Sequence, residues 1–204
     1  MEFWSDVMID RSFKVLQELR KRLDFVLIGG WAVYFFTGAT KSKDIDMIVD
    51  FENLSKVKSD LDIKKNVLLR KYESEMEGVS IDIYVPYYSD FAIPVEEIVK
   101  NIVVVENFRI PKPEILLILK QQAEMQRKDS VKGQKDRVDI VSLAISGKVN
   151  WRRYVQLLRK FNLEDYAKTL KRIVRSARIE FEYLGITNPR EIKKTREKTL
   201  REMV

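Results

Sequence analysis

Two aspartates separated by a single residue, Asp44 and Asp46, stand in the segment KDIDMIVD. In an extended strand the side chains alternate between two faces, so we expect both carboxylates on one face and Ile45 and Met47 on the other. Carboxylates this close repel each other unless a cation lies between them. Mg²⁺, or Mn²⁺ in its place, prefers such oxygen ligands where substrate phosphates complete its shell. The pair therefore predicts a metal site.

A glycine pair and a third aspartate accompany the Asp-x-Asp pair. FVLI followed by Gly29 and Gly30 is typical of a short buried strand that enters a turn, where backbone N–H groups can approach a triphosphate. Asp82 lies between isoleucines in VSIDIYVP, a second predicted strand. Asp-x-Asp pairs and Gly-Gly turns each occur in proteins that bind nothing there. The third aspartate in the same setting favours a nucleotide-binding and metal-binding site.

The order of these features resembles the nucleotidyltransferase-fold superfamily of DNA polymerase beta, in which a glycine turn, Asp-x-Asp and a third acid follow one another. The resemblance implies an α/β (α+β) fold, a small mixed sheet flanked by helices with a helical C-terminal region. It also implies transfer of a nucleoside monophosphate from a nucleoside triphosphate, such as ATP, to an acceptor hydroxyl. Asp44 and Asp46 would hold the Mg²⁺ that bridges the triphosphate, and Asp82 would help to hold a second ion.

The elements that must position these residues follow from apolar spacing. Apolar residues three and four apart predict an amphipathic helix over residues 6–22, and WAVYFF predicts a short buried helix that ends near Gly38. We expect a surface helix over residues 53–62, followed by a hairpin of VLLRKYES and VSIDIYV around Glu77 and Gly78. This hairpin would bring the third aspartate beside the first two.

Farther along, a lysine lies within an apolar helix, and acidic residues open the next one. Lys120 interrupts the predicted helix PEILLILKQQAEMQR, and GQKDRVDIVSLAI places Lys135, Asp136 and Asp139 near the start of another. This arrangement resembles the AbiE-type nucleotidyltransferase toxins of abortive-infection toxin–antitoxin systems. The resemblance implies that the chain is the toxin of such a system and has a cognate antitoxin protein as a partner.

The resemblance covers about residues 9–146 and assigns roles by position. It implies the following catalytic residues: Asp44, Asp46, Asp82, Lys120 and Asp136, of which the first three are also the metal ligands. It implies the following nucleotide-binding residues: Gly29, Gly30, Lys120 and Lys135. The family often has an arginine four residues before the first aspartate, where this chain has Thr40. We therefore expect Lys41 or Lys43 to take the place of that arginine, and the loop residues Lys41, Ser42 and Lys43 are candidates for phosphate contact.

Each of these residues also has an ordinary structural role. Lys120 is equally compatible with a lysine at the edge of a core helix that keeps its ammonium group in water. Lys135 and Asp139 are equally compatible with a surface ion pair between successive helical turns. The loop residues Ser42 and Lys43 need have no ligand at all.

Composition excludes several classes of chemistry. The chain has 204 residues, 45% of them hydrophobic, and contains no cysteine and no histidine. Disulfides, thiolate-zinc sites and mechanisms that use Ser-His, Cys-His or His-metal groups are therefore excluded. No apolar run has the length of a membrane span and the first residues do not resemble a signal peptide, so we expect a cytoplasmic protein with no membrane partner.

Basic residues are concentrated near the C-terminus. Residues 1–147 contain 22 basic and 24 acidic side chains, whereas residues 148–204 contain 16 and 7. We expect a catalytic domain over residues 1–147 and a basic helical region over residues 148–204. Such an excess of positive charge commonly contacts a polyanion, although it is also compatible with a solvated surface. The candidate nucleic-acid-binding residues are Arg152, Arg153, Arg172 and Arg175.

The favoured acceptor is RNA, with tRNA suggested by the toxin resemblance. Two alternatives stay open at this point. The chain is also compatible with a catalytically inactive nucleotide-binding or RNA-binding module of the same fold, and with an enzyme that nucleotidylates protein side chains. Binding in the presence of a chelator would separate a pure RNA binder from a metal-dependent enzyme.

Overall fold

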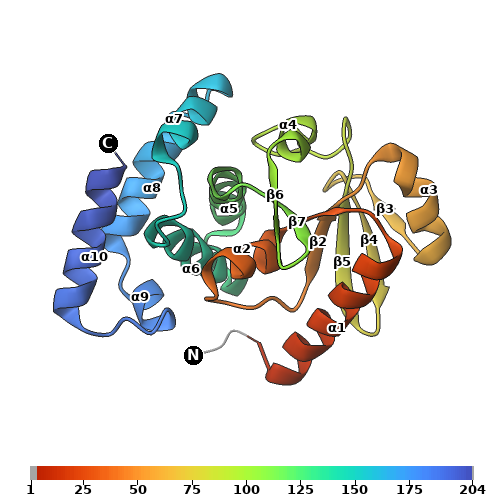
Figure 1. Ribbon diagram of the computed structural model, residues 1–204, viewed down its shortest axis with the longest axis horizontal. Helices are drawn as coiled ribbons and strands as arrows, with labels where there is room; N and C mark the ends of the chain where they lie inside the picture. The colour runs from red at the N-terminus through yellow and green to blue at the C-terminus, as the bar shows by residue number, and fades with distance from the viewer. Residues whose placement is uncertain (1–3, 204) are drawn as a thin grey trace.

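A five-stranded mixed sheet forms the centre of the N-terminal part of the molecule (Figure 1). The computed structural model describes residues 4–203. The sheet has the strand order β1-β2-β5-β4-β3, in which β2 and β5 are parallel and the other neighbours are antiparallel. Its strands are β1 (Val26–Ile28), β2 (Ile45–Ile48), β3 (Lys64–Asn66), β4 (Lys71–Met76) and β5 (Val79–Tyr84).

Helices flank this sheet and make up the C-terminal part of the chain, which confirms the predicted fold class. A separate hairpin is formed by β6 (Ile102–Val105) and β7 (Phe108–Pro111). The helices that precede this hairpin are α1 (Asp6–Arg22), α2 (Gly29–Thr37), α3 (Phe51–Asp60) and α4 (Val95–Lys100). Those that follow it are α5 (Pro113–Arg127), α6 (Val131–Ile145), α7 (Trp151–Lys160), α8 (Asp165–Ser176), α9 (Ile179–Tyr183) and α10 (Pro189–Glu202). No helix within the described range is both long and apolar enough to span a bilayer.

Strand register decides which side chains enter the core. Ile45 of β2 pairs with Ile81 of β5, and Met47 pairs with Ile83. All four side chains are fully buried, so each makes the large apolar contribution of a core residue. Side chains alternate along a strand. Asp46, between Ile45 and Met47, and Asp82, between Ile81 and Ile83, must therefore point to the opposite face of the sheet.

The segment before β4 differs from the prediction. The predicted strand VLLRKYES begins at Lys71, and residues 67–70 form the turn that joins β3 to β4. Lys64–Asn66 pair with Lys71–Glu73, so the apolar residues between them fall at the tip of a hairpin. The other predicted hairpin is confirmed, because β4 and β5 turn at Glu77 and Gly78.

Helices α5 and α6 form a tightly joined antiparallel pair beside the sheet. Pro113 opens α5, where its missing N–H costs no hydrogen bond. The Ser130 hydroxyl caps α6 by accepting a hydrogen bond from the N–H of Gly133. A Cβ atom on Gly133 would collide with the carbonyl of Arg127, so the short connection between the helices requires glycine.

The C-terminal helices lie on the far side of α5 and α6 from the sheet (Figure 1). Buried polar contacts join them to this helix pair. The Tyr154 hydroxyl donates to Gln121 Oε1 at 2.6 Å, and the Arg137 guanidinium contacts both Glu124 and Glu180. These contacts fix the basic helices at a distance from the acidic face of the sheet.

Candidate functional site

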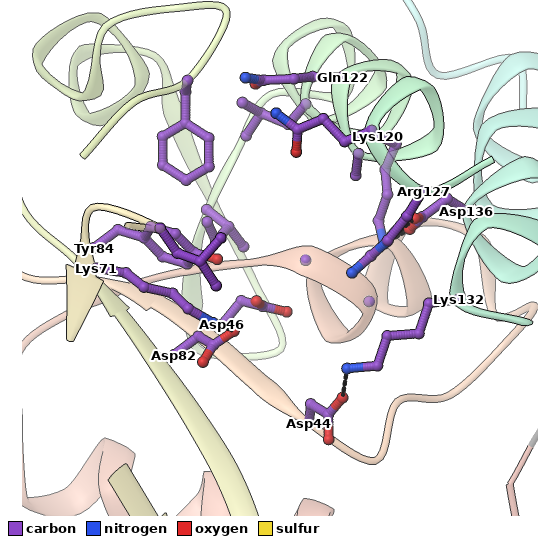
Figure 2. A pocket seen from close by; sticks show the side chains of 18 of the residues that line it. Asp44, Asp46, Lys71, Asp82, Tyr84, Lys120, Gln122, Arg127, Lys132 and Asp136 are labelled. Carbon is purple, nitrogen blue, oxygen red and sulfur yellow. Dashed lines mark hydrogen bonds and ion pairs between the residues drawn. The ribbon is translucent and has the colours of Figure 1, made fainter. Parts of the chain in front are cut away.

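A cavity of about 550 Å³ opens between the sheet and the helix pair α5 and α6 (Figure 2). Strands β2 and β5 and the start of α2 form one wall. Helix α5, the α5–α6 connection and the start of α6 form the opposite wall. The sequence-predicted residues that line it are Gly29, Gly30, Ser42, Asp44, Asp46, Asp82, Lys120, Lys135 and Asp136.

Two of the three aspartates are direct neighbours on parallel strands. Asp46 on β2 is in register with Asp82 on β5, and Figure 2 shows the two side chains next to each other. Asp44 precedes β2 and lies lower on the same wall, as the alternation of side chains predicts. The three carboxylates thus lie in one cavity, although Asp82 is far from the other two in the chain.

Asp46 carries an unusual charge environment. Burial and the neighbouring Asp82 raise its pKa from 3.8 to about 6, and the positive charges of Lys120 and Arg127 oppose this rise only partly. A raised pKa means that the charged carboxylate is disfavoured where it lies. The charged Asp46 carboxylate is therefore poorly stabilised at neutral pH, and a cation bound beside it would relieve this.

The glycine pair fits closely against this acidic wall. Gly29 and Gly30 are the first two residues of α2, where the sequence predicted a turn before a helix that begins at Trp31. Gly29 has a φ of +67°, and a Cβ atom there would collide with the Asp46 carboxylate. A Cβ atom on Gly30 would lie 2.8 Å from Ser42 Oγ and 2.9 Å from Lys135 Nζ. Only glycine leaves the first N–H groups of α2 open to an anion in the cavity.

Two lysines that the sequence analysis missed pair with these aspartates. The Lys71 ammonium group lies 2.7 Å from Asp82 Oδ2 and 2.9 Å from Glu73 Oε1. The Lys132 ammonium group lies 2.9 Å from Asp44 Oδ2, as the dashed line in Figure 2 shows. A signal for Lys71 was present in the sequence. The turn at Glu77 and Gly78 sets Glu73 opposite Asp82, and Lys71 is two residues away on the same face.

These ion pairs bear on metal binding. Within residues 4–203, no group of three or more acidic side chains is arranged closely enough to form a metal cage. Carboxylate oxygens are nevertheless the donors that suit a hard cation such as Mg²⁺, and the raised pKa of Asp46 shows that its charged form is poorly stabilised where it lies. The residues therefore fit a divalent ion by their chemistry. Full use of Asp44 and Asp82 as ligands would require Lys132 and Lys71 to move.

The opposite wall contains a buried network of opposite charges. Lys120 Nζ lies 3.0 Å from Asp136 Oδ1 and 2.7 Å from Asp139 Oδ2. Burial alone would lower the pKa of Lys120, but attraction to Asp139 and Asp136 is stronger and raises it. The Arg127 Nε donates to Asp136 Oδ2 at 2.7 Å, so Asp136 holds two cations in place. Lys120 is thus fully charged, and it lines the cavity rather than extending into solvent.

Lys135 belongs to the same network. Its ammonium group lies 2.9 Å from Asp139 Oδ2, which confirms the pairing between helical turns but places it in the interior. Burial is the main cause of the lowered pKa of Lys135, whereas Lys120 and Lys135 together lower the pKa of Asp139 against the effect of burial. The Thr40 hydroxyl also donates to Asp139, at 2.6 Å. Thr40 therefore joins the loop before β2 to α6.

The remaining predicted residues, apart from Ser42, lie outside this cavity. Ser42 is buried and lines it, whereas the Lys43 ammonium group lies over the Trp4 ring, 4.2 Å from its centre, and is not among the described lining residues. Arg152, Arg172 and Arg175 are exposed on α7 and α8. Arg153 is half-buried and donates to Asn101 Oδ1 at 3.2 Å. The structure thus separates the basic helices from the three aspartates.

Cations on the α5–α6 connection were also missed by the sequence analysis. Arg127 and Lys132 both line the cavity and both face the acidic wall (Figure 2). They lie on either side of the turn formed by residues 128–130, so the same short connection positions both. Either residue can contact a phosphate. This chain has Thr40 where AbiE-type toxins often have an arginine, so Arg127 or Lys132 could take over the phosphate contact of that arginine.

Comparison with known proteins supports the fold. No protein-family model matches the sequence, and no curated protein matches it. The structure is similar to that of ANT(2″)-Ia in complex with adenylyl-2″-tobramycin, with a TM-score of 0.52 and 15% identity over 76% of this chain and 97% of that chain. It is also similar to JHP933 from Helicobacter pylori, with a TM-score of 0.52 and 18% identity over 98% of this chain and 94% of that chain.

A third solved structure is an antigenic nucleotidyltransferase-like protein from Paracoccidioides brasiliensis. It aligns with a TM-score of 0.41 and 19% identity over 82% of this chain and 93% of that chain. The similarities to ANT(2″)-Ia and JHP933 show that the chain has the nucleotidyltransferase fold, as the sequence predicted. The closer resemblance to AbiE-type toxins stays a prediction.

Proposed function

We propose that this protein transfers a nucleoside monophosphate from a nucleoside triphosphate to an acceptor hydroxyl and releases pyrophosphate. The observation that carries the proposal is the juxtaposition of Asp46 and Asp82, in register on parallel strands, with Asp44 in the same cavity. The cavity also contains the open N-terminus of α2 and a set of cations on the opposite wall. The shared fold with ANT(2″)-Ia, whose structure contains an adenylylated small molecule, supports this assignment.

Mg²⁺, or Mn²⁺, would be held by Asp44, Asp46 and Asp82. Bound there, it would neutralise the triphosphate charge and make the α-phosphorus more electrophilic. The N–H groups at Gly29 and Gly30 would donate to phosphate oxygens, as helix N-termini do for anions. Lys120 and Lys135 line the facing wall, with the Lys135 ammonium group close to Gly30, and would offset the remaining phosphate charge.

The reaction that this arrangement supports is an in-line displacement. The acceptor oxygen forms a bond to the α-phosphorus while the bond from the α-phosphorus to the oxygen that bridges to the β-phosphate breaks. Pyrophosphate carries that electron pair away, and the acceptor proton passes to the Asp82 carboxylate. Arg127 and Lys132 are placed to bind the charge that develops on pyrophosphate, because both face the aspartates across the cavity.

RNA is the acceptor that we favour, with tRNA suggested by the resemblance to AbiE-type toxins. Such an acceptor needs a positive surface away from the aspartates, and the exposed arginines of α7 and α8 supply one. The toxin role, with an antitoxin protein as partner, belongs to the same proposal. An enzyme that nucleotidylates a protein side chain is the alternative acceptor class.

One observation favours a second function. Lys71 and Lys132 already pair with Asp82 and Asp44, and such pairs would also stabilise a site that binds a nucleotide or RNA without turnover. A catalytically inactive module of the same fold is therefore the competing proposal. It predicts nucleotide binding without the release of pyrophosphate.

Labelling experiments test these proposals against one another. The protein is incubated with each nucleoside triphosphate labelled at the α-phosphate, with Mg²⁺ or Mn²⁺, and with total RNA or total protein. We expect label in RNA, and we expect none with Asp46→Asn. The control is Asp50→Asn, an exposed residue next to α3. Label in protein would show that a protein side chain, and not RNA, is the acceptor. Bound nucleotide without any labelled product would support the inactive module.

A further inference from the structure

The turn between β3 and β4 exposes large apolar side chains. Val67 is 71% exposed, Leu68 is 91% exposed and Leu69 is 56% exposed. A single exposed apolar residue needs no explanation, but three in succession form a patch of the kind that marks binding surfaces. We call residues 67–70 the rim loop, because they lie at the mouth of the cavity.

The rim loop is held in a defined position. The N–H of Leu69 donates to Asn66 Oδ1 at 2.9 Å, and Arg70 Nε donates to the carbonyl of Tyr88 at 2.7 Å. The Tyr88 hydroxyl in turn donates to the carbonyl of Asn66 at 3.2 Å. Its leucines are therefore presented to solvent by a fixed turn that is tied to the loop after β5.

An exposed tyrosine extends this surface. Tyr87 is 84% exposed and has a φ of +59°, a conformation that most residues avoid. The carboxylate of Glu96 holds it there by accepting the Tyr87 N–H at 2.6 Å. Tyr87 adjoins Tyr88, whose carbonyl anchors Arg70, so the same loop carries the exposed Tyr87 ring and holds the rim loop.

Basic residues flank the same surface. Lys64 and Lys65 on β3 and Arg70 in the rim loop are exposed, whereas the nearby acids are Asp62, Asp90 and the partly exposed Glu73, which pairs across the hairpin with Lys64. The Lys65 ammonium group lies 4.6 Å from the centre of the Tyr88 ring, so charge and aromatic surface are interleaved. This combination suits an anionic ligand that also has flat apolar groups, which describes unpaired nucleotides.

The rim loop is continuous with the reactive end of the cavity. Leu68, Leu69 and Arg70 line the cavity, and the next residue, Lys71, pairs with Asp82. The cations of α5 and α6 that suit the triphosphate lie on the opposite wall. A ligand bound along the rim loop would thus reach Asp82 from the side where an acceptor hydroxyl must enter.

We propose that Lys64, Lys65, Leu68, Leu69, Arg70 and Tyr87 form a binding surface for the single-stranded end of the RNA acceptor. The tyrosine and leucines stack against unpaired bases, and the basic side chains contact the phosphates between them. This inference rests on the proposed function and makes it more specific. The basic helices α7 and α8 would bind other parts of the same RNA, where stacking is not needed.

The test compares single-stranded with duplex RNA. A fluorescent single-stranded oligonucleotide, and the duplex of the same sequence, are titrated with the full chain, and anisotropy is measured. The variant combines Leu68→Ser, Leu69→Ser and Tyr87→Asn, because asparagine tolerates a positive φ. We expect single-strand affinity to fall about tenfold or more and duplex affinity to change little. The matched control, Val104→Ser with Ile179→Ser, removes exposed apolar groups elsewhere and should change neither.

A second variant protects the test against a folding defect. Lys64→Gln with Lys65→Gln leaves every buried contact intact and should reduce the salt dependence of single-strand binding. Unchanged single-strand affinity in both variants, or equal losses for single strand and duplex, would overturn the proposal. The proposal would also be overturned if this surface bound an unfolded protein tightly and did not bind RNA. Transfer of the α-phosphate label to RNA by the wild-type chain separates these outcomes from failure of the proposed function, which would abolish that transfer.

Discussion

Replacing Asp46 with asparagine should stabilise the metal-free protein at neutral pH. The pKa of Asp46 is raised from 3.8 to about 6, so between these pH values the folded state binds more protons than the unfolded state. Stability therefore falls as pH rises from about 4 to 6 and stays lower above 6. The difference between the two pKa values corresponds to about 3 kcal/mol.

The expected gain is smaller than this figure because Asp46 is half-buried at the wall of an open cavity. We expect Asp46→Asn to raise the free energy of unfolding at pH 7.5 by between about 1 and 3 kcal/mol. At pH 3, where aspartate is also neutral, the two proteins should be equally stable. The advantage of the variant should grow through the interval between about pH 4 and 6.

Urea denaturation in EDTA, repeated from pH 3 to 8, measures this difference directly. Asp50→Asn is the control, because that residue is exposed and lies outside the cavity. A variant that is less stable than the wild type at pH 7.5 would refute the assigned electrostatics. So would a gain of the same size at every pH, since a protonation equilibrium could not produce it.

Three further predictions concern the cations. Lys120→Met leaves Asp136 and Asp139 short of a buried counter-charge, so urea denaturation should show a loss of about 3 kcal/mol or more, and unchanged stability would contradict the buried network. Lys71→Met frees Asp82 and should tighten Mn²⁺ binding measured by electron paramagnetic resonance, whereas weaker binding would show that Lys71 does not compete with the ion. Neutralising four of the arginines of α7 and α8 should reduce the salt dependence of RNA binding and raise the KM for RNA without changing nucleotide affinity. Normal modification of RNA by that variant would show that the region is only a solvated surface. The four substitutions are Arg152→Gln, Arg153→Gln, Arg172→Gln and Arg175→Gln.

The acidic wall could be predicted from the sequence because its determinants are local. The alternation of Asp44, Ile45, Asp46 and Met47 assigns each side chain to a face once the segment is extended. The apolar setting of Asp82 marks a second strand of the same kind. Neither pattern specifies that β2 and β5 are adjacent and parallel, so the register that brings Asp46 beside Asp82 emerges only from the tertiary structure.

The facing wall was predicted less completely because its interactions join separate helices. The sequence indicated Lys120, Lys135 and Asp136, but the positions of Arg127 and Lys132 depend on the turn between α5 and α6. Nothing local shows that a lysine of α6 reaches an aspartate before β2. The rim loop was missed for a different reason, since its apolar residues have the composition of a strand and lie in a turn.

Calorimetric titration with a non-hydrolysable nucleoside triphosphate tests the central claim most directly. The claim is that the cavity between the aspartates and α5 binds a triphosphate together with a divalent cation. We predict one binding site per chain in Mg²⁺, and we predict that EDTA or Asp46→Asn weakens binding by about tenfold or more while Asp50→Asn has no effect. Binding of equal strength in Mg²⁺, in EDTA and in Asp46→Asn would contradict the claim, because the nucleotide would then lie elsewhere.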